Sequence, residues 1–85
     1  MTQWNEEQET LRKRIEINPD IMTGKPVIRG TRIPVELVVR MLAQGMTAKD
    51  ILTEYPHLTR MDVQAALLYA AENLEESEVF PVHPE

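Results

Sequence analysis

Apolar residues in the second half of the chain repeat at the spacing of amphipathic helices. In residues 35–43 they occur at i, i+3, i+4 and i+7, and Gly45 is placed to end the helix. The same spacing recurs in residues 47–55, through Ala48, Ile51, Leu52 and Tyr55. A third series runs from residue 59 to about residue 76, through Val63, Leu67, Ala70 and Leu74. The pattern therefore predicts three helices.

Polar residues mark the boundaries of the second and third helices. Thr47 and Asp50 have the spacing of an N-cap and N3 pair in a capping box, with aspartate in place of the preferred glutamate. Thr59 and Asp62 repeat this arrangement before the third helix. Pro56 ends the second helix, because proline cannot continue the backbone hydrogen bonds. The short connection that results is typical of a helix-turn-helix.

Two short segments earlier in the chain have the features of strands. Residues 15–17 alternate apolar and polar side chains, and residues 27–33 contain several β-branched residues interrupted near Gly30. They predict a two-stranded ribbon, which must lie on the helices or pair with a second chain because an isolated ribbon is marginal in water. Gly30 indicates either a backbone conformation that other residues resist or a close approach by another backbone. Pro34 is expected to fix a helical φ near the first turn of the next helix.

The predicted third helix is apolar on more than one side. Residues 65–71 contain no charge, although a single small core uses only one face of a helix. We therefore expect a second face to pack against another subunit or protein, and we predict a homodimer. A helix that is simply central to its own domain is an equal alternative.

The two ends of the chain lack these patterns. Residues 1–14 mix charges and amides, and we interpret them as a mobile N-terminal arm, with a solvated helix as the alternative. The basic run Arg12-Lys13-Arg14 is of the kind that usually forms a solvated face. Residues 77–85 predict an irregular C-terminal tail. Residues 15–76 then form a single domain, mainly α: a three-helix, helix-turn-helix (homeodomain-like or winged-helix-like) domain preceded by a short two-stranded β element.

Composition narrows the class of protein. The chain has 85 residues, with 14 acidic and 9 basic side chains and a formal net charge of -5. This length supports one small core, and the charge argues against simple binding to nucleic acid. The absence of cysteine fits a reducing cytoplasm, and no apolar run approaches the roughly 18 residues of a membrane span. We expect a cytoplasmic protein that does not enter a membrane.

Catalysis and cofactor binding have little support in the sequence. His57 and His83 are the only histidines, so the spacing offers neither a zinc site nor a pair of nucleophile and base. The phosphate-binding patterns GxxxxGK[ST] and GxGxxG are also absent. We expect no enzymatic activity, no metal and no cofactor.

The helix-turn-helix pattern makes double-stranded DNA a candidate partner. The exposed residues at the start of the third helix would be Thr59, Arg60 and Gln64, and the last two share a face at i and i+4. Both side chains can donate to bases or phosphates. Asp62 and Glu54 oppose this prediction, because they would repel phosphate. Ordinary solvent-facing side chains on a three-helix core are the alternative.

Positive charge is concentrated in residues 24–34, against the trend of the whole chain. This segment holds Lys25, Arg29 and Arg32 and contains no acidic residue. Together with Gly30 and Thr31 they form the candidate motif for partner binding or for structure. The alternative is that Arg29 and Arg32 pair with acids of their own chain, such as Glu16 or Glu36.

The string GKPVIRGTRIPV in this segment, with the strings LAQGMT and YPHLT further on, resembles the family known as domain of unknown function 433. The resemblance covers residues 15–73. It implies a homeodomain-like or winged-helix-like fold and a role as an antitoxin similar to the VapB type. Such an antitoxin binds a toxin with a PIN-like nuclease fold and, in complex with it, operator DNA.

The resemblance and the basic segment together suggest a mechanism of inhibition. Arg29 and Arg32 are expected to contact either DNA phosphate or the carboxylates of a nuclease partner, where they would occupy the place of the metal. A protein-interaction or dimerisation module that never contacts DNA is the competing prediction, favoured by the net charge and the apolar third helix.

Overall fold

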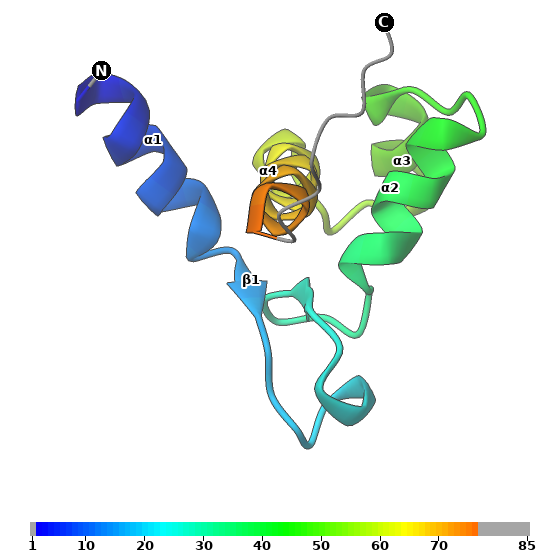
Figure 1. Cartoon of the computed structure of the whole chain (residues 1–85). Helices are drawn as coiled ribbons and strands as arrows, with labels where there is room; N and C mark the ends of the chain where they lie inside the picture. Colours follow the sequence, from blue (N-terminus) through cyan, green and yellow to red (C-terminus); the bar gives the residue numbers. More distant parts are fainter. Residues whose placement is uncertain (1, 77–85) are drawn as a thin grey trace, which may run out of the picture.

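Four helices and a two-stranded sheet make up the protein, as seen in a computed structural model that describes residues 2–76 (Figure 1). The predicted class, mainly α with a short β element, is confirmed. The elements in chain order are α1 (Thr2–Arg12), β1 (Ile15–Glu16), the short turn η1 (Met22–Gly24), β2 (Val27–Ile28), α2 (Val35–Ala43), α3 (Ala48–Glu54) and α4 (Arg60–Glu76). The predicted tail, including His83, lies outside the described residues.

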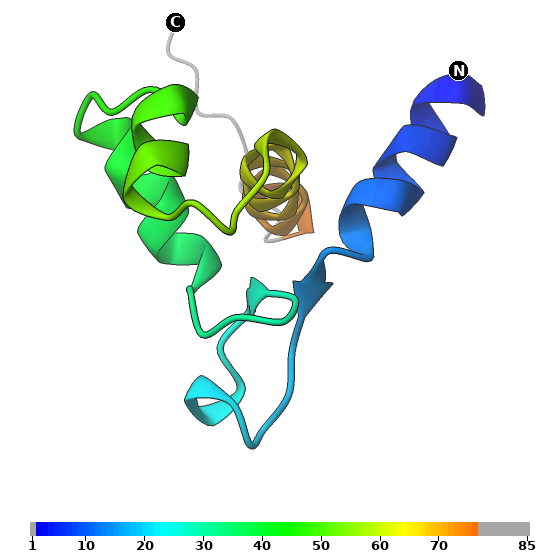
Figure 2. The same ribbon diagram turned by 180° about the vertical axis from the view of Figure 1, so that it is seen from behind.

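α4 is the centre of the fold. It lies between α1 on one side and α2 and α3 on the other, an arrangement that is the same from the front and from behind (Figures 1 and 2). Its most extensive packing is against α2, and it also contacts α1, α3 and β1. None of the helices in residues 2–76 is long and apolar enough to span a membrane.

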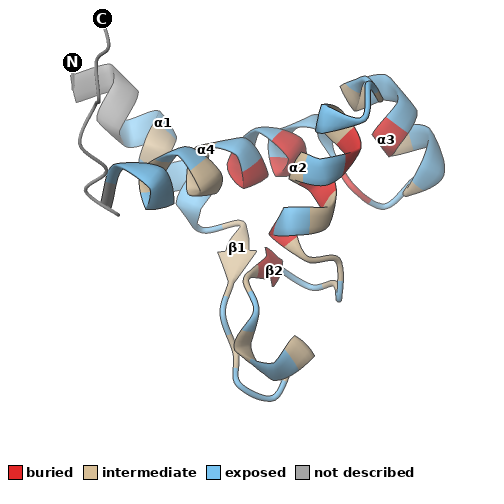
Figure 3. Cartoon of the chain, turned by 45° about the vertical axis from the view of Figure 1, so that its right-hand side comes forward, coloured by how far each residue is buried: buried red, intermediate tan, exposed pale blue. Residues whose placement is uncertain are grey.

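The core lies where α2, α3 and α4 meet (Figure 3). Its buried residues are Ile28, Val35, Val38, Met41, Ile51, Leu58, Val63 and Ala66. The apolar stripe predicted for the third helix is wrong at two positions, because Leu67 is 45% exposed and Leu74 is 69% exposed. Ala65 and Ala66 take the inward positions instead, and such small side chains allow a close approach of neighbouring helices. Leu67 and Leu74 are therefore left on the outer face of α4.

The ribbon is antiparallel, with Ile15 opposite Ile28 and Glu16 opposite Val27. The chain after β2 turns back on itself, because the Ile28 amide donates to the Ile33 carbonyl at 3.0 Å. Gly30 lies in this turn with φ +81°, and a Cβ placed there would meet no atom within 4 Å. Its conformation, rather than a close approach, is therefore the reason for glycine. Because Val27 and Ile28 are almost fully buried, the ribbon rests on its own helices.

The N-terminal segment forms helix α1, as in the helical alternative for residues 1–14, and this helix contacts α4. The basic run that follows its last turn holds it to α4. Arg12 Nε donates to both carboxylate oxygens of Glu72 at 3.1 Å, and Arg14 Nη1 lies 3.0 Å from Asp62 Oδ1. The hydrogen bond that Arg12 donates to Glu72 raises the pKa of Arg12, which stays charged. The prediction that this run is only a solvated face is incomplete.

Both predicted capping boxes are present. In α3 the Asp50 amide donates to Thr47 Oγ1 at 3.1 Å, and Asp50 Oδ2 accepts from the Thr47 amide at 2.9 Å. In α4 the equivalent distances between Thr59 and Asp62 are 3.3 Å and 2.9 Å. Pro34 is the N-cap residue of α2 and lies one position before the helix, not in its first turn.

Candidate functional site

The three cations of the basic segment have different surroundings. Lys25 Nζ lies 3.1 Å from Glu36 Oε2 on the surface. Arg29 Nε donates to the carbonyl of Lys13 at 2.6 Å, so this side chain is held by main chain and not by an acid. Arg32 is exposed and has neither a hydrogen bond nor an ion pair with any residue in the described part of the chain. The alternative in which these two arginines pair with Glu16 or Glu36 is not found.

The turn that carries Arg32 is held by its own hydrogen bonds. Thr31 Oγ1 donates to the Ile28 carbonyl at 2.7 Å and accepts from the Ile33 amide at 2.9 Å. Thr31 and Gly30 therefore shape the turn, and Arg32 projects from a defined backbone. We call Arg29 and Arg32, with the turn between them, the arginine turn.

An open hollow of about 530 Å³ lies beside the arginine turn. Arg32 and Thr31 line it together with the turn before α4, and its other polar members are Glu16, Tyr55 and His57. Arginine, histidine and tyrosine can all donate hydrogen bonds to an oxygen of a partner. The hollow therefore suits a polar or anionic group, and the sequence spacing did not show that His57 lies near Arg32.

The residues predicted to bind DNA lie at the start of α4 in three different settings. The hydroxyl of Thr59 is used in the capping box. Arg60 is exposed, and its side chain forms no hydrogen bond or ion pair with another described residue. Gln64 is exposed but lines a groove opposite Glu7 of α1. Asp62 is only 7% exposed and is paired with Arg14, so it opposes phosphate less than its sequence position suggests.

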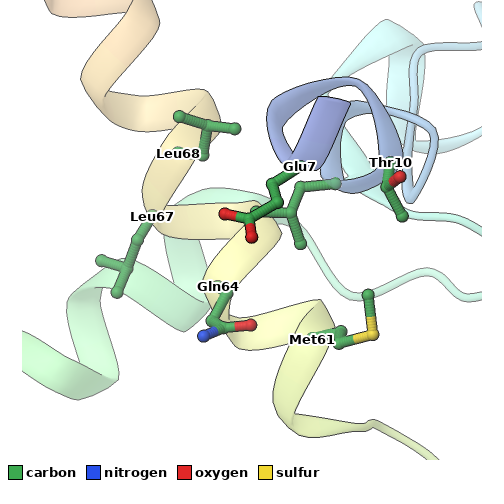
Figure 4. Close-up of a pocket in the computed structure, with 7 residues that line it drawn as sticks. Glu7, Thr10, Met61, Gln64, Leu67 and Leu68 are labelled. Carbon is green, nitrogen blue, oxygen red and sulfur yellow. The ribbon is translucent and has the colours of Figure 1, made fainter. Parts of the chain in front are cut away.

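The groove between α1 and α4 has a volume of about 680 Å³, and we call it the α1–α4 groove (Figure 4). Its lining residues come from both helices: Glu7, Thr10, Leu11, Met61, Gln64, Leu67 and Leu68. In Figure 4 the carboxylate of Glu7 extends from α1 toward Gln64 and Leu67 of α4. Sequence reasoning missed this site because residues 1–14 were interpreted as an arm, although the apolar run of residues 65–71 predicted a second contact face.

No group of three or more His, Asp or Glu side chains in residues 6–75 is arranged to hold a metal ion. Two candidate surfaces of the described residues are the arginine turn with its hollow and the α1–α4 groove. They define a small helical protein with a basic turn on its β element and an apolar groove beside its central helix.

The chain belongs to the family described as "Protein of unknown function (DUF433)", which it matches over residues 15–70. One relative is the "Uncharacterized protein y4eO" of Sinorhizobium fredii, 37% identical over 62 residues. That match spans 73% of this chain but only 28% of the relative's length.

A solved structure of the same family is also similar to this fold. It is the crystal structure of a DUF433 member from Anabaena variabilis, with 37% sequence identity and a TM-score of 0.70. The similarity covers 88% of this chain and 74% of that one. The family match begins at β1, so α1 and its wall of the groove lie outside it.

Proposed function

We propose that this chain is a non-enzymatic antitoxin that binds a PIN-like nuclease toxin through the arginine turn. The observation that carries the proposal is Arg32, an exposed guanidinium without an acidic partner in residues 6–75. Unlike Lys25, which already has Glu36, this side chain is available to an external carboxylate. Arg29 adds a second guanidinium, of which only Nε is engaged by the chain itself.

The rigidity of the turn supports this role. An arginine on a mobile loop loses conformational entropy when it binds, whereas the Thr31 hydrogen bonds already fix the backbone beside Arg32. A guanidinium forms two parallel hydrogen bonds with a carboxylate, and a PIN-like active site consists of carboxylates that hold metal. Inserted arginines would take the position of the metal and block catalysis.

Charge distribution favours a protein partner over DNA for the surface of α4. Gln64 faces the acidic side chain of Glu7 across the groove, and phosphate at this position would be repelled. Operator binding by a complex with the toxin is the second part of the antitoxin hypothesis, and it would rely on Thr59 and Arg60. A module that binds protein or dimerises without contacting DNA is the alternative, and the apolar groove favours it.

The experiment is co-purification of the chain with the product of its neighbouring gene, combined with a nuclease assay of that product. Arg32→Ala should weaken the complex by about tenfold or more, as truncation of a buried interface arginine commonly does. Arg40→Ala is the matched control, because Arg40 is also an exposed arginine but lies on α2. Equal binding by both variants would remove the arginine turn from the interface.

DNA binding is tested separately. A gel-shift titration with the promoter region of its own operon, at low salt, compares the chain alone with the purified complex. A shift that requires the complex and is lost with Arg60→Ala supports the operator role. If neither sample shifts the DNA, the operator role is wrong. The alternative, a module that binds protein without contacting DNA, is then the function.

A further inference from the structure

The α1–α4 groove is mainly apolar, because four of its seven lining side chains are apolar and the others are Glu7, Thr10 and Gln64. Leu11 comes from α1, and Met61, Leu67 and Leu68 come from α4. Met61 and Leu67 are 37% and 45% exposed, so the groove leaves large apolar side chains open to solvent. Its volume of about 680 Å³ is within the range of protein sites that enclose ligands or the side chains of a partner.

The two helices that form the groove also carry the negative charge of the chain. α1 has three acids and one base, and α4 has four acids and one base, so together they hold a net charge of -5. The formal net charge of the whole chain is also -5, so the rest of the sequence is neutral in sum. Adding Arg14, which pairs with Asp62 and lies 3.7 Å from Met61 Sδ, still leaves these two helices, the walls of the groove, net negative. Glu7 is the one charged side chain among the residues that line the groove itself.

We propose that the α1–α4 groove binds an amphipathic helix of a partner protein whose polar face is cationic. Leucine-type side chains of this helix fill the apolar floor, and its lysines or arginines lie along the acidic walls. Glu7 is the residue that would bind a cation of the partner helix, because its side chain lines the groove. No hydrogen bond or ion pair joins this side chain to another residue in residues 6–75.

Charge selects this occupant over two others. A second copy of the chain would bring two sets of acidic walls together, and like charges across an interface are unfavourable. An anionic membrane surface would be repelled for the same reason. A cationic helix instead gains from both the apolar floor and the walls.

The test uses a fluorescent peptide of 14 residues made only of leucine and lysine, with leucines at helical i, i+3, i+4 and i+7 spacing. Fluorescence anisotropy should show saturable binding to the full chain. A peptide of the same composition with scrambled leucines, and one with glutamate in place of lysine, should each bind at least about tenfold more weakly. Equal binding by the scrambled peptide would mean that charge alone is responsible and would overturn the proposal.

Two variants locate the binding. Leu67→Gln should weaken the lysine peptide by about tenfold, since it removes part of the floor. Ile17→Gln is the matched control, because Ile17 is 58% exposed, directly follows β1 and lies outside the groove. Glu7→Gln should weaken binding of the lysine peptide and reduce its dependence on salt. Each variant is first compared with the parent by thermal unfolding.

Sedimentation of the chain without peptide measures its oligomeric state and tests whether a second copy of the chain fills the groove. If the chain is a dimer that Leu67→Gln dissociates and Ile17→Gln does not, a second copy fills the groove and the proposal is wrong. Arg32→Ala should leave peptide binding unchanged. The experiments can therefore refute the proposal for the groove and the proposal for the arginine turn independently of each other.

Discussion

The capping boxes of α3 and α4 form a matched pair. The aspartate of the α4 box is more buried than that of the α3 box, and it also forms an ion pair. Asp50 and Asp62 have the same position and the same backbone contacts. Asp62 also lies 3.0 Å from Arg14, with side chains that are 9% and 36% exposed respectively. Substitution of each aspartate by alanine therefore separates the cap from the ion pair.

Asp50→Ala keeps the Thr47 N-cap but removes the hydrogen bond from the Thr47 amide to the carboxylate, and should lower the free energy of unfolding by about 1 kcal/mol, a typical net value for one hydrogen bond. Asp62→Ala removes the equivalent hydrogen bond from the Thr59 amide and leaves Arg14 without its carboxylate. An ion pair of this intermediate burial should add about 1–2 kcal/mol, between the roughly 0.2–1 kcal/mol of exposed pairs and the about 3–5 kcal/mol of breaking buried ones. The total for Asp62→Ala is then about 2–3 kcal/mol.

Urea unfolding followed by the circular dichroism of the helices measures both variants. Arg14→Met alone, and combined with Asp62→Ala, completes a double-mutant cycle whose coupling energy should be about 1–2 kcal/mol. If Asp62→Ala costs no more than Asp50→Ala, or if the coupling is near zero, the ion pair does not stabilise the attachment of α1 and the reasoning is refuted.

Three further predictions concern the loops and the attachment of α1. Thr23 has φ +53°, a conformation that β-branched residues resist, so Thr23→Asn should raise the free energy of unfolding by about 0.5–1 kcal/mol in urea titrations. Gly30→Ala should lower it by about 1–2 kcal/mol through φ alone, because a Cβ there has no atom to clash with. Glu72→Gln removes the exposed ion pair with Arg12 and should speed hydrogen exchange in the amides of α1 at low salt, with no difference at high salt.

Local signals predicted most of the fold. The first helix was predicted at the residues where α2 lies, and both capping boxes form with the predicted partners. Such features depend on residues three or four positions apart, whose relation is fixed by helix geometry. The turn at Gly30 is local in the same sense, since its φ of +81° is a property of one residue.

Contacts across the chain were beyond the reach of sequence reasoning. In α4, Val63 is followed at i+3 by Ala66 and at i+4 by Leu67, and both satisfy the helical spacing of a core face. Because α2 packs closely on α4, the small side chain of Ala66 takes the fully buried position. Leu67 is turned outward instead. Spacing within one helix carries no information about the shape of its neighbour.

The same limit applied to the charges. Arg12 and Glu72 are 60 positions apart, and Arg14 and Asp62 are 48 apart, so no local pattern joins them. The sequence therefore predicted a solvated face for the basic run of residues 12–14 and an arm for the segment that forms α1. The α1–α4 groove was missed for that reason, because it exists only once α1 is placed.

The internal use of Lys25 and Arg29, the other two cations of the basic segment, makes Arg32 more informative. Arg12 and Arg14 form ion pairs with acids of α4, and Lys25 forms one with Glu36. Arg29 Nε donates a hydrogen bond to a main-chain carbonyl. Arg32 is left on a rigid turn, while the acidic walls of the groove lie with α1 and α4. A partner that used both surfaces would need carboxylates for the turn and a cationic helix for the groove. The opposite charge requirements of the two surfaces mean that variants at Arg32 and Glu7 can identify which part of the partner each one contacts.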